Sequence, residues 1–173
     1  MAVGSTNLVS AYNFRDGRAG GIEAGAILVL GRRFQAFANG TLQKSMGRGI
    51  ESATYLFSPD DLANQGWQFL DHDQRWTANA GATFKESGSR VSALLEYGSG
   101  LRTGPNNDQH VPGHVRVDLS AGHEFLTLPM RPAFAVDLVN MFDTHYAYRI
   151  NNGFNGSHWA PGRSIFARVS ANF

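Results

Sequence analysis

Six histidines and one acidic triplet are the groups in this 173-residue chain best suited to catalysis or metal binding. None of the histidines lies in an H-E-x-x-H motif or another zinc-type spacing, and no cysteine is present to supply a thiolate. The triplet Asp71-His72-Asp73 carries groups for acid–base or metal chemistry, but its position between a loop and a strand favours a solvated loop. We expect neither a metal site nor a cofactor. The histidines are His72, His110, His114, His123, His145 and His158.

Ser99 and His110 are the best available nucleophile and base. Ser99 does not lie in the G-x-S-x-G elbow that activates a serine in hydrolases. The glycine-flanked segments at Gly47–Gly49 and Gly98–Gly100 open no helix, so neither is a phosphate-binding loop. We therefore predict that the chain is not an enzyme.

The elements that carry these residues are predicted by an alternation of apolar and polar side chains. In the final segment, Gly162–Phe173, Ile165, Val169 and Phe173 share one apolar phase with two alanines. Such alternation is typical of a strand with one face in an apolar medium and the other in a polar one. A terminal amphipathic strand that ends on Phe is typical of bacterial outer-membrane β-barrels, in which it acts as the assembly signal.

The same period recurs upstream and predicts an all-β, antiparallel, up-and-down transmembrane β-barrel of about eight strands. A few residues break the phase: Ile27, Val29, Phe37, Leu94 and Phe166, with a slip near Val139–Asn140. The weakest strand is the first, and we expect it to close the barrel by pairing with the last. The predicted strands lie at Asn7–Phe14, Ile22–Leu30, Phe34–Leu42, Trp76–Phe84, Val91–Tyr97, Val115–Phe125, Phe134–Leu138 and Gly162–Phe173.

The predicted connections alternate between short and long. Tight turns are expected at Gly31-Arg32, Glu86–Gly88 and Leu126–Pro129, and long loops at Ser45–Asp73, Ser99–Pro112 and Thr144–Pro161. Outer-membrane barrels have short periplasmic turns and long outer loops. Aromatic loop residues could bind a ligand, which the sequence does not identify: Tyr55, Phe57, Trp67, Phe69, Tyr146, Tyr148, Phe154 and Trp159.

Aromatic residues lie at the ends of the predicted strands. Phe34, Phe84 and Phe125 are beside the tight turns, whereas Trp76 and Tyr97 are beside the long loops. Two belts of this kind are expected where aromatic rings meet the two interfaces of a bilayer. The alternative is that they are core aromatics of a soluble barrel.

The opposite phase of the strands carries charges of both signs. In a closed eight-stranded barrel they would face the interior and could neutralise each other, since an unpaired buried charge costs several kcal/mol. In a larger barrel they would face water instead. The main inward charges are Glu23, Glu96, Asp118, Asp137, Arg75, Arg116 and Arg168.

Length and charge favour one domain, residues 1–173, with a formal net charge of +1, which argues against a nucleic-acid partner. No apolar run approaches the roughly 20 residues of a membrane-spanning helix. Met1–Ser5 lacks the features of a signal peptide, so we expect the sequence of a mature or an engineered chain. The expected location is the bacterial outer membrane, with the lipid bilayer and the barrel-assembly machinery as partners of a monomer.

Motifs near the end of the chain resemble one family. Val139–Asp143 followed by His145-Tyr146-Ala147 is similar to the "N-L-F-D-x-x-Y" signature of TonB-dependent receptors, which lies on their penultimate strand. Ala160–Phe173 resembles their closing strand, which begins with "PGR". Leu70–Arg75, Tyr97–Gly104 and Gly20–Gly25 are similar to other segments of such barrels.

The resemblance implies descent from a protein that takes up iron chelates, cobalamin or similar nutrients. Family members also carry a plug domain, a TonB box and a barrel of twenty-two strands. This sequence has neither of the first two and room for about eight strands, so we do not expect energised transport by the chain alone. The alternatives are a stand-alone eight-stranded barrel that serves as a scaffold or adhesion module, and a soluble lipocalin-type barrel.

Overall fold

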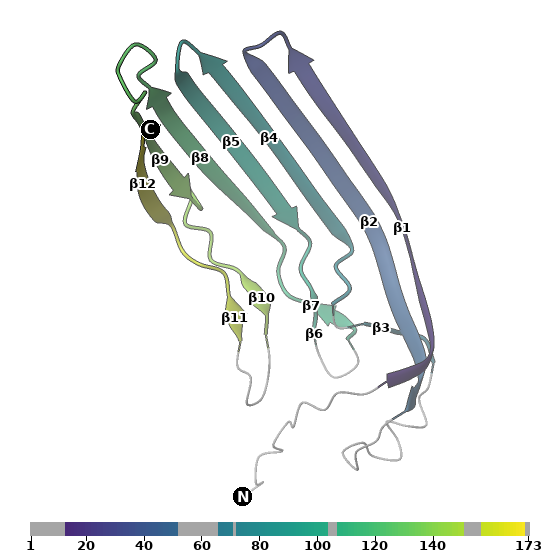
Figure 1. Ribbon diagram of the computed structural model, residues 1–173. Helices are drawn as coiled ribbons and strands as arrows, with labels where there is room; N and C mark the ends of the chain where they lie inside the picture. Colours follow the sequence, from purple (N-terminus) through teal and green to yellow (C-terminus); the bar gives the residue numbers. More distant parts are fainter. Residues whose placement is uncertain (1–12, 52–65, 71, 104–106, 151–156, 172–173) are drawn as a thin grey trace, which may run out of the picture.

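The alternating segments pair in chain order, each with the one before it, into one antiparallel sheet (Figure 1). The computed structural model describes residues 13–51, 66–70, 72–103, 107–150 and 157–171. A short strand, β3 (Gln68–Phe69), pairs with the end of β2 and makes this an eight-stranded sheet. The predicted all-β antiparallel meander of about eight strands is confirmed. The seven main strands are β1 (Asn13–Leu30), β2 (Phe34–Glu51), β4 (Trp76–Glu86), β5 (Ser89–Gly98), β8 (His114–Glu124), β9 (Ala133–Val139) and β12 (Ser164–Ser170).

The register of the sheet sorts side chains onto two faces, because residues that pair across antiparallel strands point to the same side. Leu119, for example, pairs with Ala93 on one side and Leu138 on the other. Residues that pair across successive strands form rows that cross the sheet. On one face, no charged side chain occurs from the row that contains Ile22 to the row that contains Leu30, and we call this face the apolar face. It includes Ile22, Leu28, Leu30, Phe34, Leu42, Trp76, Phe84, Val91, Leu95, Tyr97, Val115, Val117, Leu119, Val136, Leu138 and Ile165.

The opposite, polar face contains the residues that break the alternation. Ile27 pairs with Phe37, whose ring lies over Gly81, and Gly81 in turn pairs with Leu94. A Cβ at Gly81 would lie 2.5 Å from Cε1 of Phe37, so this contact requires a glycine. The apparent phase errors therefore line up across β1, β2 and β5 as an apolar band within the polar face.

The connections differ in length at the two ends of the sheet (Figure 1). Residues 31–33, 87–88 and 125–132 join strands at the turn end. At the loop end, longer connections carry two hairpins, β6 (Arg102–Thr103) with β7 (Gln109–His110) and β10 (Ala147–Arg149) with β11 (His158–Trp159). The expected alternation of short and long connections is present.

The bounds of the first two strands were predicted wrongly. The loop expected from Ser45 begins later, because β2 continues to Glu51 and its last residues form a backbone ladder with the first part of β1. Asn13 and Phe14 do not belong to a separate first strand, since β1 runs unbroken from Asn13 to Leu30. The rest of the strand predicted at Asn7–Phe14 lies outside the described residues.

The two edge strands of the sheet run in the same direction. Each of the seven main strands reverses the one before it, so β1 and β12 both run from the loop end to the turn end. No described strand pairs with the outer edge of either one. If these edges met directly, they would pair as parallel strands, unlike every other pair in the sheet.

Candidate functional site on the polar face

Ion pairs cross the middle of the polar face. Glu96 and Arg116 pair directly between β5 and β8, and their side chains approach to 3.1 Å (Arg116 Nη2 to Glu96 Oε2). Arg116 Nε also lies 3.3 Å from Asp118 Oδ1. The three predicted inward charges are thus brought together by the register of adjacent strands.

A second ion pair lies towards the edge of the sheet. Arg168 donates to both carboxylate oxygens of Asp137, at 2.7 Å from Nε and 2.9 Å from Nη2. The hydroxyl of Ser120 donates to the same carboxylate at 2.6 Å. Glu23 and Arg75 belong to the same phase, but neither forms an ion pair with another described residue: Glu23 pairs with Thr41 in the ladder, and Arg75 precedes β4.

A polar pocket of about 360 Å³ opens where this face meets the loop end. Its lining includes Gln74, Asn79, Glu96, His114 and Tyr148. The buried ring of His114 stacks on Tyr146 with centroids 3.7 Å apart, and His114 Nε2 lies 3.7 Å from Glu96 Oε1. The pocket thus offers a carboxylate, an imidazole and a phenol to a polar ligand.

The phenols of Tyr146 and Tyr148 lie 3.3 Å apart beside this pocket. Burial, followed by the hydrogen bond to Tyr148, raises the pKa of Tyr146 to about 12. Tyr146 therefore stays a neutral hydroxyl at physiological pH. The Tyr146 carbonyl oxygen also accepts a hydrogen bond from the Ala160 amide at 2.9 Å, just before β10. Phe154 of the same loop lies outside the described residues, as do Tyr55 and Phe57 of the earlier loop.

The signature segment Val139–Asp143 forms a junction between strands rather than a ligand site. Asn140 is fully buried, and its side-chain amide donates to the carbonyl oxygens of Thr144 and Pro161 at 3.1 and 3.2 Å. Its side-chain oxygen accepts from the Thr144 amide at 2.9 Å. Asp143 accepts from the backbone amide of Arg163 at 2.8 Å, which ties this segment to the start of β12.

The buried aspartate at the loop end was missed by the sequence analysis. Asp73, expected in a solvated loop, is 1 % exposed and forms an ion pair with Arg102 at 3.2 Å. Its other oxygen accepts from the Ser45 amide at 2.6 Å. The prediction of a solvated loop is wrong for Asp73, because a hairpin about thirty residues further along the chain covers it. His72 is exposed, and Asp71 lies outside the described residues.

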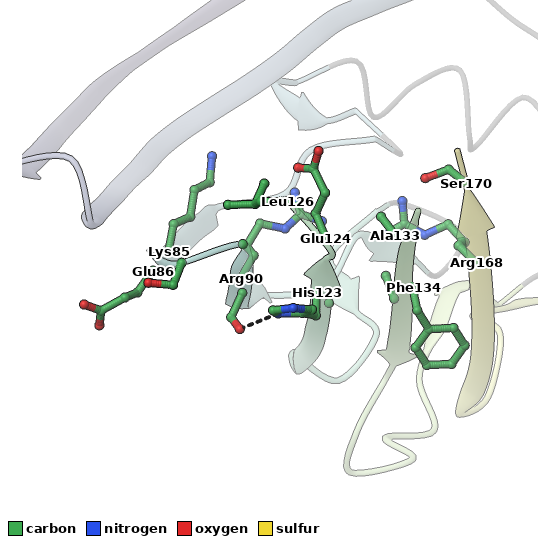
Figure 2. Close-up of a pocket in the computed structure, with 15 residues that line it drawn as sticks. Lys85, Glu86, Arg90, His123, Glu124, Leu126, Ala133, Phe134, Arg168 and Ser170 are labelled. Atoms are coloured by element: carbon green, nitrogen blue, oxygen red, sulfur yellow. Dashed lines mark hydrogen bonds between the residues drawn. The ribbon is translucent and has the colours of Figure 1, made fainter. Parts of the chain in front are cut away.

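Ser99 and His110, the best available nucleophile and base in the sequence, form hydrogen bonds with other groups. The hydroxyl of Ser99 accepts from the Trp76 amide at 3.0 Å, and Nδ1 of His110 lies 3.0 Å from the carbonyl oxygen of Val111. At the turn end, Ser89 Oγ and His123 Nδ1 lie 2.9 Å apart at a pocket of about 520 Å³ (Figure 2). No carboxylate in the described ranges hydrogen-bonds to His123, so this pair lacks an orienting acid. Across those ranges, no group of three or more His, Cys, Asp or Glu side chains could hold a metal ion.

The residues proposed as belts and as the assembly signal lie on or beside the apolar face. Phe34 pairs with Phe84 next to the turns, and Phe125 follows β8 at the same end. Trp76 and Tyr97 lie at the loop end of the face. Ile165 and Val169 of β12 are exposed, at 71 % and 78 %, whereas Phe173 lies outside the described residues.

Comparison with known proteins gives no family for this chain. No protein-family model matches the sequence, and no curated protein is similar to it at a significant level. Among the described residues, no helix is long and apolar enough to cross a bilayer.

Proposed function

We propose that the chain forms part of the wall of a bacterial outer-membrane β-barrel similar to the C-terminal part of a TonB-dependent receptor. The apolar face would meet lipid, and the polar face would line the barrel interior. The observation that carries this proposal is the charge-free face across seven paired strands. From Ile22 to Leu30 it spans about nine residues, the length with which a tilted strand crosses a bilayer.

The arrangement of the ends supports one orientation. The turn end would face the periplasm and the loop end the exterior, as in outer-membrane barrels. Phe34 and Phe84 would then form the inner aromatic belt, and Trp76 and Tyr97 the outer one. Phe173, with Ile165 and Val169, would act as the assembly signal that the barrel-assembly machinery recognises.

The direction of the edge strands favours a barrel larger than this sheet. Bacterial barrels pair antiparallel throughout and have an even number of strands. The seven main strands leave β1 and β12 running in the same direction. An odd number of further strands between these two edges would make the total even and every pair antiparallel. We propose that these strands belong to the same receptor and that the chain alone does not carry out energised transport. We also propose that it has no catalytic role. The alternative, a stand-alone scaffold or adhesion barrel, would need one further strand from the residues before Asn13.

The reading frame that encodes the chain separates these possibilities. A plug domain and a TonB box encoded upstream in the same frame would support a receptor part. A signal peptide joined directly to Met1 would favour the stand-alone barrel. At the protein level, the full chain should stay with the outer membrane after a carbonate wash. Release into the wash would contradict a membrane-embedded sheet.

A further inference from the structure

Beyond the charge-free rows, the same face of the sheet continues towards the loop end with cationic and aromatic side chains. Lys44 pairs with Gly20 and Arg18 with Met46, one and two alternations beyond the pair Ile22–Leu42. Phe69 of β3 pairs with Met46 and therefore points to the same side. We call Arg18, Lys44, Arg48, Trp67 and Phe69 the cation–aromatic cluster.

The aromatic rings hold the cations in place. The guanidinium carbons of Arg18 and Arg48 lie 4.1 and 5.0 Å from the Trp67 ring centroid, and Lys44 Nζ lies 5.1 Å from that of Phe69. A cation within about 6 Å of a ring centroid is attracted by the face of the ring.

Two of the three cations carry uncompensated charge. Arg48 Nε lies 2.9 Å from Asp16 Oδ2, and this hydrogen bond lowers the pKa of Asp16, so their charges cancel at neutral pH. Neither Arg18 nor Lys44 forms an ion pair with an acidic residue in the described part of the chain. At the turn end, by contrast, Arg33 is paired with Glu86 at 3.0 Å. Among the described residues, Arg18 and Lys44 therefore add positive charge to the loop end of this face.

We propose that the cation–aromatic cluster binds phosphate groups of lipid headgroups in the bilayer leaflet at the loop end. This inference rests on the proposed function, which places the apolar face in lipid. Two residues along a strand advance roughly 6.6 Å, so Lys44 and Arg18 lie at headgroup depth, just above the acyl chains. Guanidinium and ammonium groups bind phosphate, and Trp is enriched at this interface.

The geometry favours a phosphate attached to a lipid over free phosphate. The cluster is an open face that continues directly into the apolar face through Leu42 and Ile22. A phosphate bound to Arg18 and Lys44 would thus have its acyl chains against these residues, whereas inorganic phosphate would gain no apolar contact. Phosphorylated lipid should therefore bind much more tightly than inorganic phosphate.

The test uses the full chain in detergent. It is titrated separately with diphosphorylated lipid A, with dephosphorylated lipid A and with inorganic phosphate. Native mass spectrometry counts the bound lipid. The double variant Arg18→Gln and Lys44→Gln should bind diphosphorylated lipid A about thirtyfold more weakly, since each cation near an anionic headgroup contributes about fivefold in affinity. The control is Lys85→Gln with Arg90→Gln, which removes the same charge from the polar face and should leave binding unchanged.

Equal weakening in the two double variants, or unchanged binding in both, would overturn the site, provided that circular dichroism shows native β-structure. Displacement of lipid A by millimolar inorganic phosphate would identify a free-anion site and also overturn it. A chain that enters bilayers but binds dephosphorylated lipid A equally well would refute the phosphate site and keep the proposed function. A chain that stays out of bilayers would refute both.

Discussion

Asn140 shows how one residue joins three strands at the loop end. Its φ of +53° lies in the left-handed region, which Asn tolerates better than most residues. Its backbone amide donates to Asp118 of β8 at 2.8 Å, while its side chain bonds the backbone that leads from β9 to β12. Few other side chains could make these bonds from this conformation.

Asn140→Ala should destabilise the protein by about 2–4 kcal/mol, because buried backbone groups lose their partners and Ala is strained at positive φ. The free energy of unfolding, from denaturant titration in lipid vesicles, measures the effect. Asn39→Ala is the matched control, since that side chain makes only a 3.4 Å contact with Asn79. Equal destabilisation by the two variants would show that the hydrogen bonds of Asn140 do not contribute to the free energy of unfolding beyond the general effect of removing an Asn side chain.

The second prediction at this scale concerns pH and Asp143. The hydrogen bond from the backbone amide of Arg163 lowers the pKa of Asp143, with a smaller contribution from His145, and burial opposes the shift. A carboxyl group with a lower pKa in the folded state stabilises the fold above its ordinary pKa and loses that contribution as the pH falls through the folded-state value. Wild-type protein should therefore lose its stability advantage over Asp143→Asn below about pH 4.

Unfolding midpoints measured from neutral pH down to about pH 3 check this expectation. Asp108→Asn, outside the junction, provides the control for general effects of removing a carboxylate. If the difference between wild type and Asp143→Asn stays constant over the whole range, the junction does not depend on the charge of Asp143.

At the scale of strands, β5 and β8 each carry an apolar and a polar side. Leu119→Arg should cost about 2–4 kcal/mol if the apolar face lies in lipid, because the charge would enter the middle of the bilayer. Ser92→Arg puts the same side chain on the polar face of the neighbouring strand and should cost much less. The two variants are unfolded in lipid vesicles, and the folded fraction is measured from gel mobility with and without heating. Equal costs would defeat the assignment of the faces.

Strand positions could be predicted from the sequence, but the role of the phase errors could not. Alternation is a local property, so β4, β5 and β8 were found close to their observed bounds. Phe37 and Leu94 look misplaced in a single strand, and only the register shows that both lie on either side of Gly81 on the polar face. The end of β2 was missed because its residues beyond Lys44 lack apolar contrast and are held by backbone pairing with β1.

In the candidate site too, local features could be predicted from the sequence and contacts between distant segments could not. The inward phase of Glu96, Arg116 and Asp118 followed from alternation alone, whereas their ion pairs needed the alignment of β5 with β8. The buried contact between Asp73 and Arg102 joins two loops, and no periodic pattern marks such a pair. The cation–aromatic cluster depends on β3, a strand of two residues that carries almost no sequence signal.

At the scale of the whole molecule, the edges of the sheet decide how the wall is completed. In the intact protein, Leu28→Cys with Ile165→Cys should form no disulfide within a chain, since further strands would separate β1 from β12. The chain has no native cysteine to interfere. Ala93→Cys with Leu119→Cys is the positive control, because these residues face each other in the ladder. A disulfide between positions 28 and 165 of one monomer would mean that the edges meet directly.

The most direct test of the central claim is a spin-label scan along β8, from position 115 to 121, in the full chain reconstituted in lipid bilayers. We predict that labels at Val115, Val117, Leu119 and Ala121 are accessible to oxygen, which concentrates in lipid. Labels at positions 116, 118 and 120 should be accessible to a water-soluble relaxation reagent instead. Accessibility with no period of two, or equal access of the water-soluble reagent at every position, would contradict a sheet with one face in lipid.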